Sequence, residues 1–422
     1  MKSIRTSLVG ALALTLAACG SVTASNGGSQ PGADSAACAS TSGVTDTSIK
    51  LAAISDLSGP VSSGGIPFYK GLDAYLAYAN EKLNTLGGRK VDLDVQDSAY
   101  DTQKALSEYR AVRDSVAAVP LAFGSAISSA LAPLAVQDCM AVMSNAASVA
   151  EKPPNIFYLG PTIEDQVINA LTWYVKTQNH PGAKVALLAQ SGASGDAMVR
   201  AAQATAQASG FTVVATQTFA ATDKTFAGQI AAIQAARPDV VLMGNQPGAA
   251  ITFFGEAQAA GATWDWLGTQ GAFAPTVFRL PISQAFQQKV VLSYGGPIFQ
   301  SGGPAIELAQ REITARHSDV ATDPSALVGW EAGLFIYGAL TNATKSNTLT
   351  RGGITAALGG LSIPGVGTPD IKFDSHGVVA GVPFHATAMA APDASVPGGL
   401  KVVAPYSAAE FIPSYYAATA QK

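Results

Sequence analysis

Serine side chains follow two short apolar segments of the chain, at positions where a hydroxyl group can bind a ligand. Ser128 comes shortly after the apolar run 119–124, and Ser148 follows the run 140–144. Ser128 also stands where a helix is expected to begin, and a first helical turn carries unpaired N–H groups and partial positive charge. Hydroxyls and amides together suit a carboxylate without any Arg or Lys. The alternative, in which Ser128 is only an N-cap, stays open because serine caps helices very often.

The surrounding sequence alternates short apolar runs with longer amphipathic segments. The first series predicts strands at 49–55, 91–95, 119–124, 140–144 and 156–159, with helices at 70–83, after Asp101, and at 128–138. The second series predicts strands at 184–188, 212–216, 240–243 and 264–267, with helices at 167–177, 195–209, 226–236 and 251–260. Such alternation is typical of parallel sheets with helices on both faces. We therefore predict an α/β protein with two doubly wound lobes, whose ligands bind outside the carboxyl ends of the strands.

The pattern changes after residue 288. A strand is expected at 290–294, and amphipathic helices at 305–316 and 327–344. The segments 371–374 and 378–385 look like a hairpin about a turn at 374–377. Late helices and a late hairpin indicate that the chain crosses back between the lobes.

The N-terminus has the pattern of an export signal. Lys2 and Arg5 precede a short apolar run that ends in small residues before Cys19. The run is too short to span a bilayer, which needs about 20 residues. Residues 1–18 resemble a bacterial lipoprotein signal, in which Cys19 carries the lipid; an ordinary signal peptide is the alternative. Residues 19–43 have the composition of a flexible tether. We expect a lipid anchor on the extracytoplasmic face of the membrane, in the periplasm or at the cell surface.

Charge and composition exclude several function classes. The full chain has a net charge of −4, and loss of Lys2 and Arg5 with the leader makes it −6. There is no basic run, whereas nucleic-acid binding needs clustered Lys and Arg. The four histidines lack metal-ligand spacing. With no catalytic or dinucleotide motif, we expect a binding protein that is neither an enzyme nor the carrier of a cofactor.

Two cysteines remain once Cys19 is assigned to lipid. Cys38 lies shortly before the first predicted strand, and Cys139 lies just before the strand at 140–144. The amino ends of parallel strands share one edge of a sheet, so the two thiols can meet, and export permits a disulfide. We expect a Cys38–Cys139 bridge that pins the end of the tether, with two free thiols as the alternative.

An ordered set of residues resembles a known family. The segment Ser58-Gly59-Pro60, Gly71 at the opening of the first helix, the segment 124–133 and the turn 373–377 are similar to bacterial leucine/isoleucine/valine-binding proteins. This resemblance implies the type I fold of the solute-binding components of ABC importers, with two lobes joined by three hinge crossovers. It places the first lobe at 44–163 and 295–366, the second at 164–294 and 367–410, and a C-terminal tail at 411–422.

The resemblance also implies a set of site residues. Ser128, Ala146 and Ser148, with Ala126 beside them, take the positions that hold an amino acid's carboxylate and ammonium groups. In the second lobe, Gln270 stands where the family has an acidic residue against the ammonium. The family's pocket tyrosines are replaced by a set of small or polar residues: Gly64, Ser194 and Gln246.

These changes leave the expected transport role in place but alter the expected ligand. A buried ammonium group without a counter-charge is costly, commonly by several kcal/mol. The implied role is therefore capture of a small ligand, a polar amino acid or amide first and an organic acid second, for delivery to an ABC transporter permease. The chain is expected to act as a monomer. A ligand-sensing receptor component that signals through a partner protein is the alternative.

Overall fold

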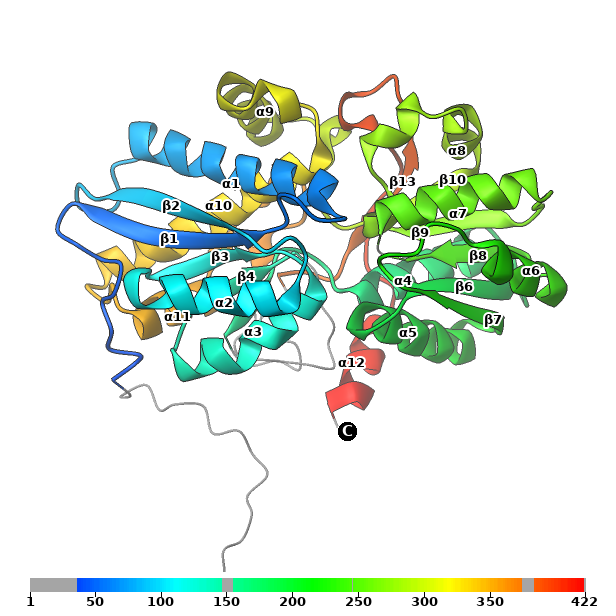
Figure 1. The fold of residues 1–422 in the computed structure, drawn as a ribbon, viewed down its shortest axis with the longest axis horizontal. Helices are drawn as coiled ribbons and strands as arrows, with labels where there is room; N and C mark the ends of the chain where they lie inside the picture. Colours follow the sequence, from blue (N-terminus) through cyan, green and yellow to red (C-terminus); the bar gives the residue numbers. More distant parts are fainter. Residues whose placement is uncertain (1–35, 146–154, 245, 374–382, 421–422) are drawn as a thin grey trace, which may run out of the picture. The chain divides into compact units, whose positions relative to one another are not determined.

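The strands form two sheets in the computed structural model, which describes residues 36–145, 155–244, 246–373 and 383–420 (Figure 1). The first sheet is wholly parallel. Its spatial order is β2 (Lys90–Asp97), β1 (Ser48–Ser55), β3 (Ala118–Ala122), β4 (Val142–Ser144) and β5 (Ile156–Tyr158). All five strands fall on predicted segments, so the first half of the α/β prediction is confirmed.

The first sheet is buried on both faces. Along β1, Leu51 and Ala53 belong to one apolar cluster, while Ala52 and Ile54 belong to another. Because successive side chains of a strand point to opposite faces, this alternation places helices on each side of the sheet. The helices of this first lobe are α1 (Ser62–Lys82), α2 (Thr102–Val112), α3 (Ser125–Gln137), α9 (Pro304–Arg316), α10 (Pro324–Lys345) and α11 (Arg351–Gly359), with short 3₁₀ turns at Arg113–Ser115 and Ser318–Val320.

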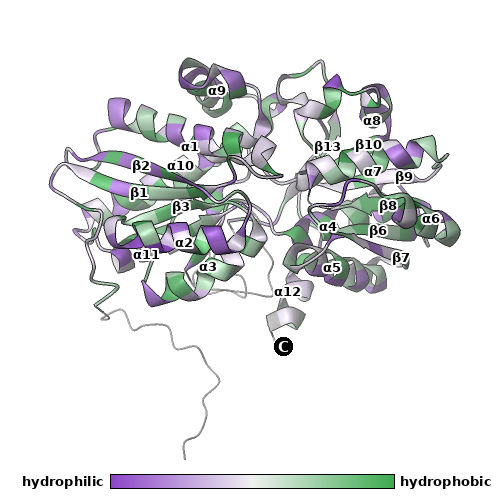
Figure 2. Cartoon of the chain, viewed as in Figure 1, coloured by the Kyte–Doolittle hydropathy of each residue, from purple (hydrophilic) through white to green (hydrophobic). Residues whose placement is uncertain are grey.

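The second sheet is mixed. Its order is β14 (Leu400–Ser407), β13 (Thr387–Pro392), β10 (Val290–Tyr294), β9 (Asp265–Thr269), β8 (Val240–Met243), β6 (Lys184–Gln190) and β7 (Thr212–Phe219). The pairs among β7, β6, β8, β9 and β10 are parallel, whereas β13 is antiparallel to both of its neighbours. Figure 2 shows hydrophobic residues concentrated in strands such as β3, β6 and β8, as expected for strands covered on both sides.

Helices cover both faces of the second sheet as well. Leu188 belongs to one apolar cluster, and Leu187 and Ala189 to another. The helices of this second lobe are α4 (Ile163–Thr172) with a π-helical end (Trp173–Thr177), α5 (Ala193–Ser209), α6 (Ala227–Ala236), α7 (Pro247–Ala259), α8 (Ser283–Lys289) and α12 (Ile412–Ala420). Gly210 ends α5 in the left-handed conformation, as the sequence predicts.

The late part of the chain differs from the expectation. The turn of the predicted hairpin lies outside the described residues, and β12 (Ile371–Lys372) pairs with β11 (Ser362–Ile363). One backbone hydrogen bond, from Lys372 N to Pro383 O, joins the two arms that the sequence pairs. The β13–β14 hairpin, which the sequence analysis did not predict, extends the second sheet by pairing β13 with β10.

The segment from 411 is a helix and not a free tail. Tyr416 of α12 is buried, and its hydroxyl donates to Asp165 Oδ1 of α4 at 2.8 Å. The same carboxylate lies 3.0 Å from His385 Nδ1, on the segment that leads into β13. Burial lowers the pKa of His385, but the hydrogen bond to Asp165 outweighs it and raises that pKa overall. The C-terminal helix is thereby bonded to the start of the second lobe.

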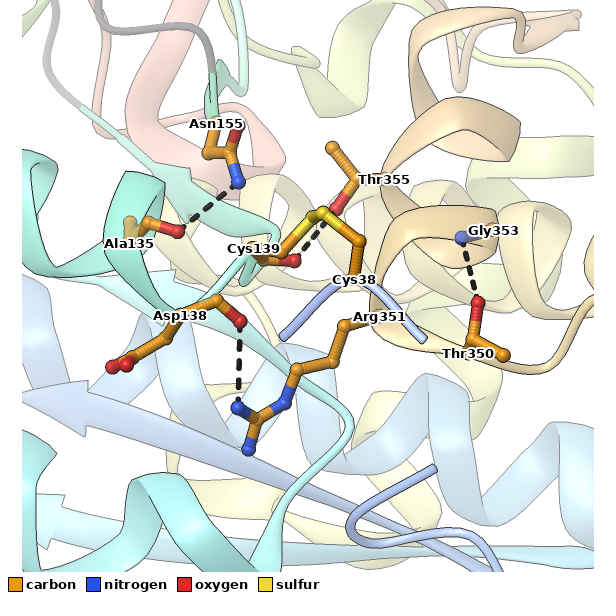
Figure 3. Close-up of a disulfide and its surroundings, with 9 residues drawn as sticks. All are labelled: Cys38, Ala135, Asp138, Cys139, Asn155, Thr350, Arg351, Gly353 and Thr355. Carbon is orange, nitrogen blue, oxygen red and sulfur yellow. Dashed lines mark hydrogen bonds between the residues drawn. A yellow bond between two sulfur atoms is a disulfide. The ribbon is translucent and has the colours of Figure 1, made fainter. Parts of the chain in front are cut away.

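A disulfide joins Cys38 to Cys139, the pairing expected from the sequence (Figure 3). Gly352 N donates to Cys38 O at 2.9 Å, and the Arg351 guanidinium donates to Asp138 O at 3.4 Å. Residues 36–43 are therefore bonded to the amino edge of the first sheet, although the sequence assigned them to the tether. The remainder of the expected tether and the whole leader lie outside the described residues.

Three connections pass between the lobes, as the type I fold requires. They run from β5 to α4, from β10 to α9 through the turn Phe299–Ser301, and from β12 to β13. The last of them includes residues that the structure does not describe. In the described parts of the chain, no helix has the length and apolar character needed to cross a membrane.

Two glycines set the spacing between α1 and α10. A Cβ atom on Gly71 would lie 1.9 Å from Ala326 O, and one on Gly329 would lie 1.9 Å from Phe68 O. Each glycine therefore faces the backbone of the opposite helix, and only a missing side chain permits this approach. Gly71 lies within α1 and not at its start, because the helix begins at Ser62 and not at residue 70.

Replacing Gly71 with alanine is expected to lower the free energy of unfolding by about 3 kcal/mol, because the two helices must separate. Gly228, an exposed glycine of α6 with no atom within 4 Å of its would-be Cβ, is the matched control. Gly228→Ala should leave stability within about 1 kcal/mol of the parent. Urea unfolding measures both, and equal stability of the two variants would contradict the close packing.

Candidate ligand-binding site

A cavity of about 140 Å³ lies between the two lobes, at the carboxyl ends of their strands. Gln190 is the last residue of β6 and Tyr294 the last of β10, and both line it. From the first lobe, Gly124 and Ser125 follow β3 directly. This is where the strand topology predicts a ligand.

The start of α3 forms one wall of the cavity. Gly124 precedes the helix with φ 106°, and a Cβ there would lie 2.6 Å from the ring of Tyr100. Gly124 N donates to Asn145 Oδ1 at 2.8 Å, which ties the end of β3 to the end of β4. The first helical bond runs from Ser128 N to Gly124 O, so the N–H groups of residues 125–127 have no partner within the helix. Asn145 therefore fixes Gly124, and the uncapped start of α3 lies at the cavity wall.

Ser125, and not Ser128, presents its hydroxyl at this wall. Ser128 is buried one turn into α3 and donates to Ser125 O at 3.1 Å, and it does not line the cavity. Ala126 does not line it either. The sequence placed the helix start at 128, whereas α3 begins at Ser125, so Ser128 lies nearly one turn into the helix. Ala146 and Ser148 lie outside the described residues.

The start of α5 faces the start of α3 across the cavity. Gly192 precedes α5 with φ 102° and gives no side-chain cap, and Ser194 lines the cavity as the sequence analysis expects. The hydroxyls of Ser194 and Ser125 are 2.6 Å apart. Two helix N-termini, each with its serine, therefore meet at one point where the lobes touch.

A third part of the wall comes from the loop after β1. Asp56 is fully buried and accepts hydrogen bonds from Gly59 N and from Val61 N, the latter at 2.8 Å. This carboxylate fixes the turn that leads into α1. The turn carries Val61 and the predicted Gly64 to the cavity.

Gln270 lines the cavity as the sequence analysis expects, but its carbonyl is engaged at the hinge. Its Oε1 accepts hydrogen bonds from the buried N–H groups of Gly295 and Gly296, each at 3.0 Å, on the second connection. Its backbone N–H donates to Gln166 Oε1 at 2.9 Å, just after the first connection. Gln270 therefore links the cavity to two of the three crossovers.

Gln246 contributes no surface to the cavity. Its side chain is buried at the start of α7, where Nε2 donates to Ala221 O at 3.1 Å. The amide of Gln246 points into the second lobe in this arrangement, and its role as a selectivity residue stays a prediction.

Aromatic rings line the cavity from positions that the sequence analysis did not consider. These rings belong to Phe68, Tyr100, Phe123, Phe273 and Tyr294. In the sequence, small or polar residues replace three tyrosines of the family's pocket. Instead, rings contributed by α1, β10 and the segments after β2, β3 and β9 keep a large part of the wall apolar.

Among the described residues, no Lys, Arg or His lines the cavity, and Asp323 is the one acidic residue that does. Asp323 is the N-cap of α10, where its Oδ1 accepts from Ser325 N at 2.8 Å. Burial raises its pKa to about 6. No cluster of metal-binding side chains occurs in the parts of the chain that the structure covers.

Some of the missed lining residues carry a signal in the sequence. Tyr294 ends a predicted strand, Gln190 lies two residues after another, and Ser125 follows Gly124 at the end of a third. Because ligands bind outside the carboxyl ends of strands in such sheets, all three residues could be predicted as lining residues. Asp323 and Phe68 carry no such signal, because helix packing and not strand order brings α10 and α1 to the cavity.

Replacing Gln270 with alanine is expected to lower the free energy of unfolding by about 2 kcal/mol, because two buried N–H groups lose their acceptor. Gln270→Glu keeps an oxygen in that place and should retain most of the stability. Urea unfolding of both variants tests this link. Equal stability of Gln270→Ala and the parent would show that the amide does not support the hinge.

Comparisons with known proteins agree with this geometry. A fatty acid ABC transporter substrate-binding protein from Thermomonospora curvata has a similar structure, with a TM-score of 0.84 at 24% identity, covering 89% of this chain and 96% of that one. A branched-chain amino acid ABC transporter protein from Thermus thermophilus with bound valine gives 0.77 at 17%, covering 88% and 99%. A solute-binding protein from R. palustris in complex with benzoate gives 0.71 at 20%, covering 86% and 98%.

The sequence has no match among the curated proteins. At sequence identities of 17–24%, the structural similarity shows the fold alone, and it confirms the type I architecture. The sequence itself matches the periplasmic binding protein family over residues 48–411, which include both sheets and the cavity between them. The chain therefore belongs to the periplasmic binding protein family.

Proposed function

We propose that this protein is an extracytoplasmic solute-binding lipoprotein that captures a small carboxylate-bearing ligand between its lobes and delivers it to an ABC transporter permease. The observation that carries the proposal is the meeting of the α3 and α5 N-termini at the Ser125–Ser194 contact. Helix N-termini bind anions through free N–H groups and the helix dipole. The two serine hydroxyls add donors, so a carboxylate is held without a basic residue.

The ligand's body is expected to be partly apolar. Aromatic rings and aliphatic side chains such as Val61, Ile163 and Val328 surround the polar groups. This mixture of apolar walls with a few polar groups is typical of small-molecule sites. The solved relatives that bind valine, benzoate or a fatty acid all take carboxylates with apolar bodies, and this supports the same class here.

Capture is proposed to occur by hinge closure. The 2.6 Å serine contact joins residues of both lobes, so a carboxylate that takes its place touches both lobes only when they are closed. Such a ligand shifts the population toward the closed form by its differential affinity. We infer that the lobes divide near 163/164, 294/295 and 366/367, and that α12 belongs to the second lobe through its buried Tyr416.

A thermal-shift panel of amino acids, amides, aliphatic acids and aromatic acids on the mature chain tests the ligand class. At 100 times its dissociation constant, a ligand stabilises the protein by about 2.7 kcal/mol. We expect stabilisation by carboxylates and none by the corresponding primary amides. Stabilisation by amides alone would contradict a carboxylate site.

The Ser125→Ala variant tests where that carboxylate lies. It is expected to weaken binding of any carboxylate found by the panel about tenfold or more, through loss of one donor to a buried charge. Ser128→Ala is the matched control one turn away, and its affinity should equal that of the parent. The reverse order of effects would restore Ser128 as the binding serine.

Membrane attachment is proposed to depend on Cys19. The apolar run with small residues before Cys19 supports lipidation. A single acyl chain gives only marginal attachment, so more than one chain is needed for a stable anchor. The Cys38–Cys139 disulfide and the Arg351 contacts would then attach the end of the tether to the first lobe, away from the cavity.

Cys19→Ser is expected to move the protein from the membrane fraction to the soluble extracytoplasmic fraction, because residue 19 then has no thiol to carry the lipid. Fractionation after expression in a bacterial host measures this, with Cys38→Ser/Cys139→Ser as the control that keeps Cys19. Retention of Cys19→Ser in the membrane would rule out the lipid anchor.

A further inference from the structure

A buried carboxylate of the first lobe lies beside two of the three connections between the lobes. Glu331 of α10 is 1% exposed, and its Oε1 accepts hydrogen bonds from Val366 N at 3.2 Å and from Thr368 Oγ1 at 2.7 Å. Val366 and Thr368 lie between β11 and β12, just before the connection from β12 to β13. Glu331 therefore fixes the segment of the first lobe from which the third connection leaves.

The second lobe reaches the same place through Tyr406 of β14. Burial raises the pKa of Tyr406 well above its usual range, and the carboxylate of Glu331 raises it further, so the two groups are close. The Tyr406 hydroxyl donates to Gly296 O on the second connection. Gly296 also faces α10 one turn before Glu331, because a Cβ there would lie 2.7 Å from Val328 Cγ2. A rotation about this connection therefore changes the surroundings of Glu331.

One oxygen of Glu331 has no hydrogen-bond donor among the residues that the structure describes. This oxygen, Oε2, is buried, and none of the ion pairs found in the same residues includes Glu331. An ionised carboxylate in such a place is unfavourable. Burial raises the pKa of Glu331 to about 7, although the hydrogen bonds from Thr368 and Val366 lower it. The carboxyl group therefore changes its charge near neutral pH.

The helices and the strand that pack on α10 give this carboxyl no counter-charge in the described parts of the chain. Lys70, Asp73 and Glu81 of α1 pair with α9 or with the turn that follows it. The other charged residues of α1 and α9 are exposed or paired within α9. Arg351 of α11 donates to backbone carbonyls at the amino edge of the first sheet, and β3 has no titratable side chain.

The remaining titratable neighbours are neutral, exposed or at the cavity. Burial raises the pKa of Tyr294 on β10, as it does for Tyr406, so both hydroxyls stay protonated. In the segment after Thr368, the side chains of Asp370 and Lys372 are exposed. Asp323, at the start of α10 itself, lines the cavity. The charge of Glu331 is therefore controlled by its access to water.

We propose that Glu331 is a proton-dependent positioning residue of the hinge, whose protonation favours the closed lobes and whose ionisation favours opening. In the described arrangement the lobes touch at Ser125 and Ser194, and Glu331 is out of water. Opening moves the two connections beside Glu331 and lets water reach Oε2, where the ionised form is better solvated. This inference rests on the proposed hinge closure and not on the identity of any ligand.

The direction of the pH effect follows from the two environments of the carboxyl group. In the closed form, burial holds the pKa of Glu331 at about 7. In the open form, contact with water returns that pKa toward the ordinary value of a glutamate. The closed form therefore binds the proton more tightly, and it loses stability relative to the open form as the pH rises through about 7.

Hydrogen exchange of the mature chain without added ligand measures hinge opening even when the open form is rare. Mass spectrometry follows the peptides that contain Gly295 and Gly296 or Val366, and each rate is divided by the intrinsic exchange rate at the same pH. Between about pH 5.5 and about pH 8, the resulting opening constant is expected to rise about fivefold or more. Peptides from β6 report global unfolding and should exchange more slowly.

Three variants separate a titrating role of Glu331 from a structural one. Glu331→Gln keeps an oxygen for Val366 N and Thr368 Oγ1 but cannot ionise, so its opening constant should stay within about twofold over that range. Glu307→Gln, at an exposed glutamate of α9, is the matched control and should keep the parent's profile. Thr368→Val removes a hydrogen bond that lowers the pKa of Glu331, so the midpoint of its profile should move to higher pH. This last variant tests the inference even if Glu331→Gln does not fold.

Several results would overturn the inference. These are a parent profile that does not change with pH, a rise that Glu331→Gln retains, and hinge peptides that exchange no faster than β6. If Asp323→Asn and not Glu331→Gln removed the rise, the cavity acid would carry the effect instead. Because no ligand is added, each of these results leaves the proposed carboxylate site standing, and failure of the thermal-shift panel leaves the role of Glu331 standing.

Discussion

The structure depends on one electrostatic arrangement: helix N-termini that follow parallel strands of two sheets converge on a cavity that no described basic side chain lines. Parallel strands force each following helix to start at the carboxyl edge of its sheet, so α3 and α5 begin where the lobes face one another. Gly124 and Gly192 leave these starts without side-chain caps. The free N–H groups then require an anion or water, and the proposed carboxylate site rests on this requirement.

The rest of the fold holds these starts in place. Asn145 fixes the end of β3, and Asp56 fixes the turn before α1. Gln270 connects the cavity to Gly295 and Gly296 on one crossover and to Gln166 beside another. These hydrogen bonds join the loop that carries Gln270 to the hinge. The Cys38–Cys139 disulfide lies at the amino edge of the first sheet, and neither cysteine lines the cavity.

Periodicity in the sequence was enough for the two lobes, because buried parallel strands are short apolar runs that stand apart from amphipathic helices. It failed at β13 and β14; in β14, exposed residues alternate with less exposed ones and interrupt the apolar pattern. The residues of the site were harder to predict than the fold. Gly64, Ser194 and Gln270 line the cavity. The predicted helix start at 128 was three residues late, because the short polar start of α3 has no apolar periodicity. The position of Asp323 at the cavity could not be predicted from the sequence, since only the packing of α10 on α1, through Gly71 and Gly329, brings it there.

The most direct measurement is a crystal structure of the mature chain with the tightest carboxylate ligand. The account predicts that the ligand's carboxylate oxygens lie within hydrogen-bonding distance of the Ser125 and Ser194 hydroxyls and of the first N–H groups of α3 and α5. It also predicts that the ligand contacts both lobes at once. A carboxylate bound elsewhere, or held by one lobe with the two helix starts left to water, would contradict the central claim.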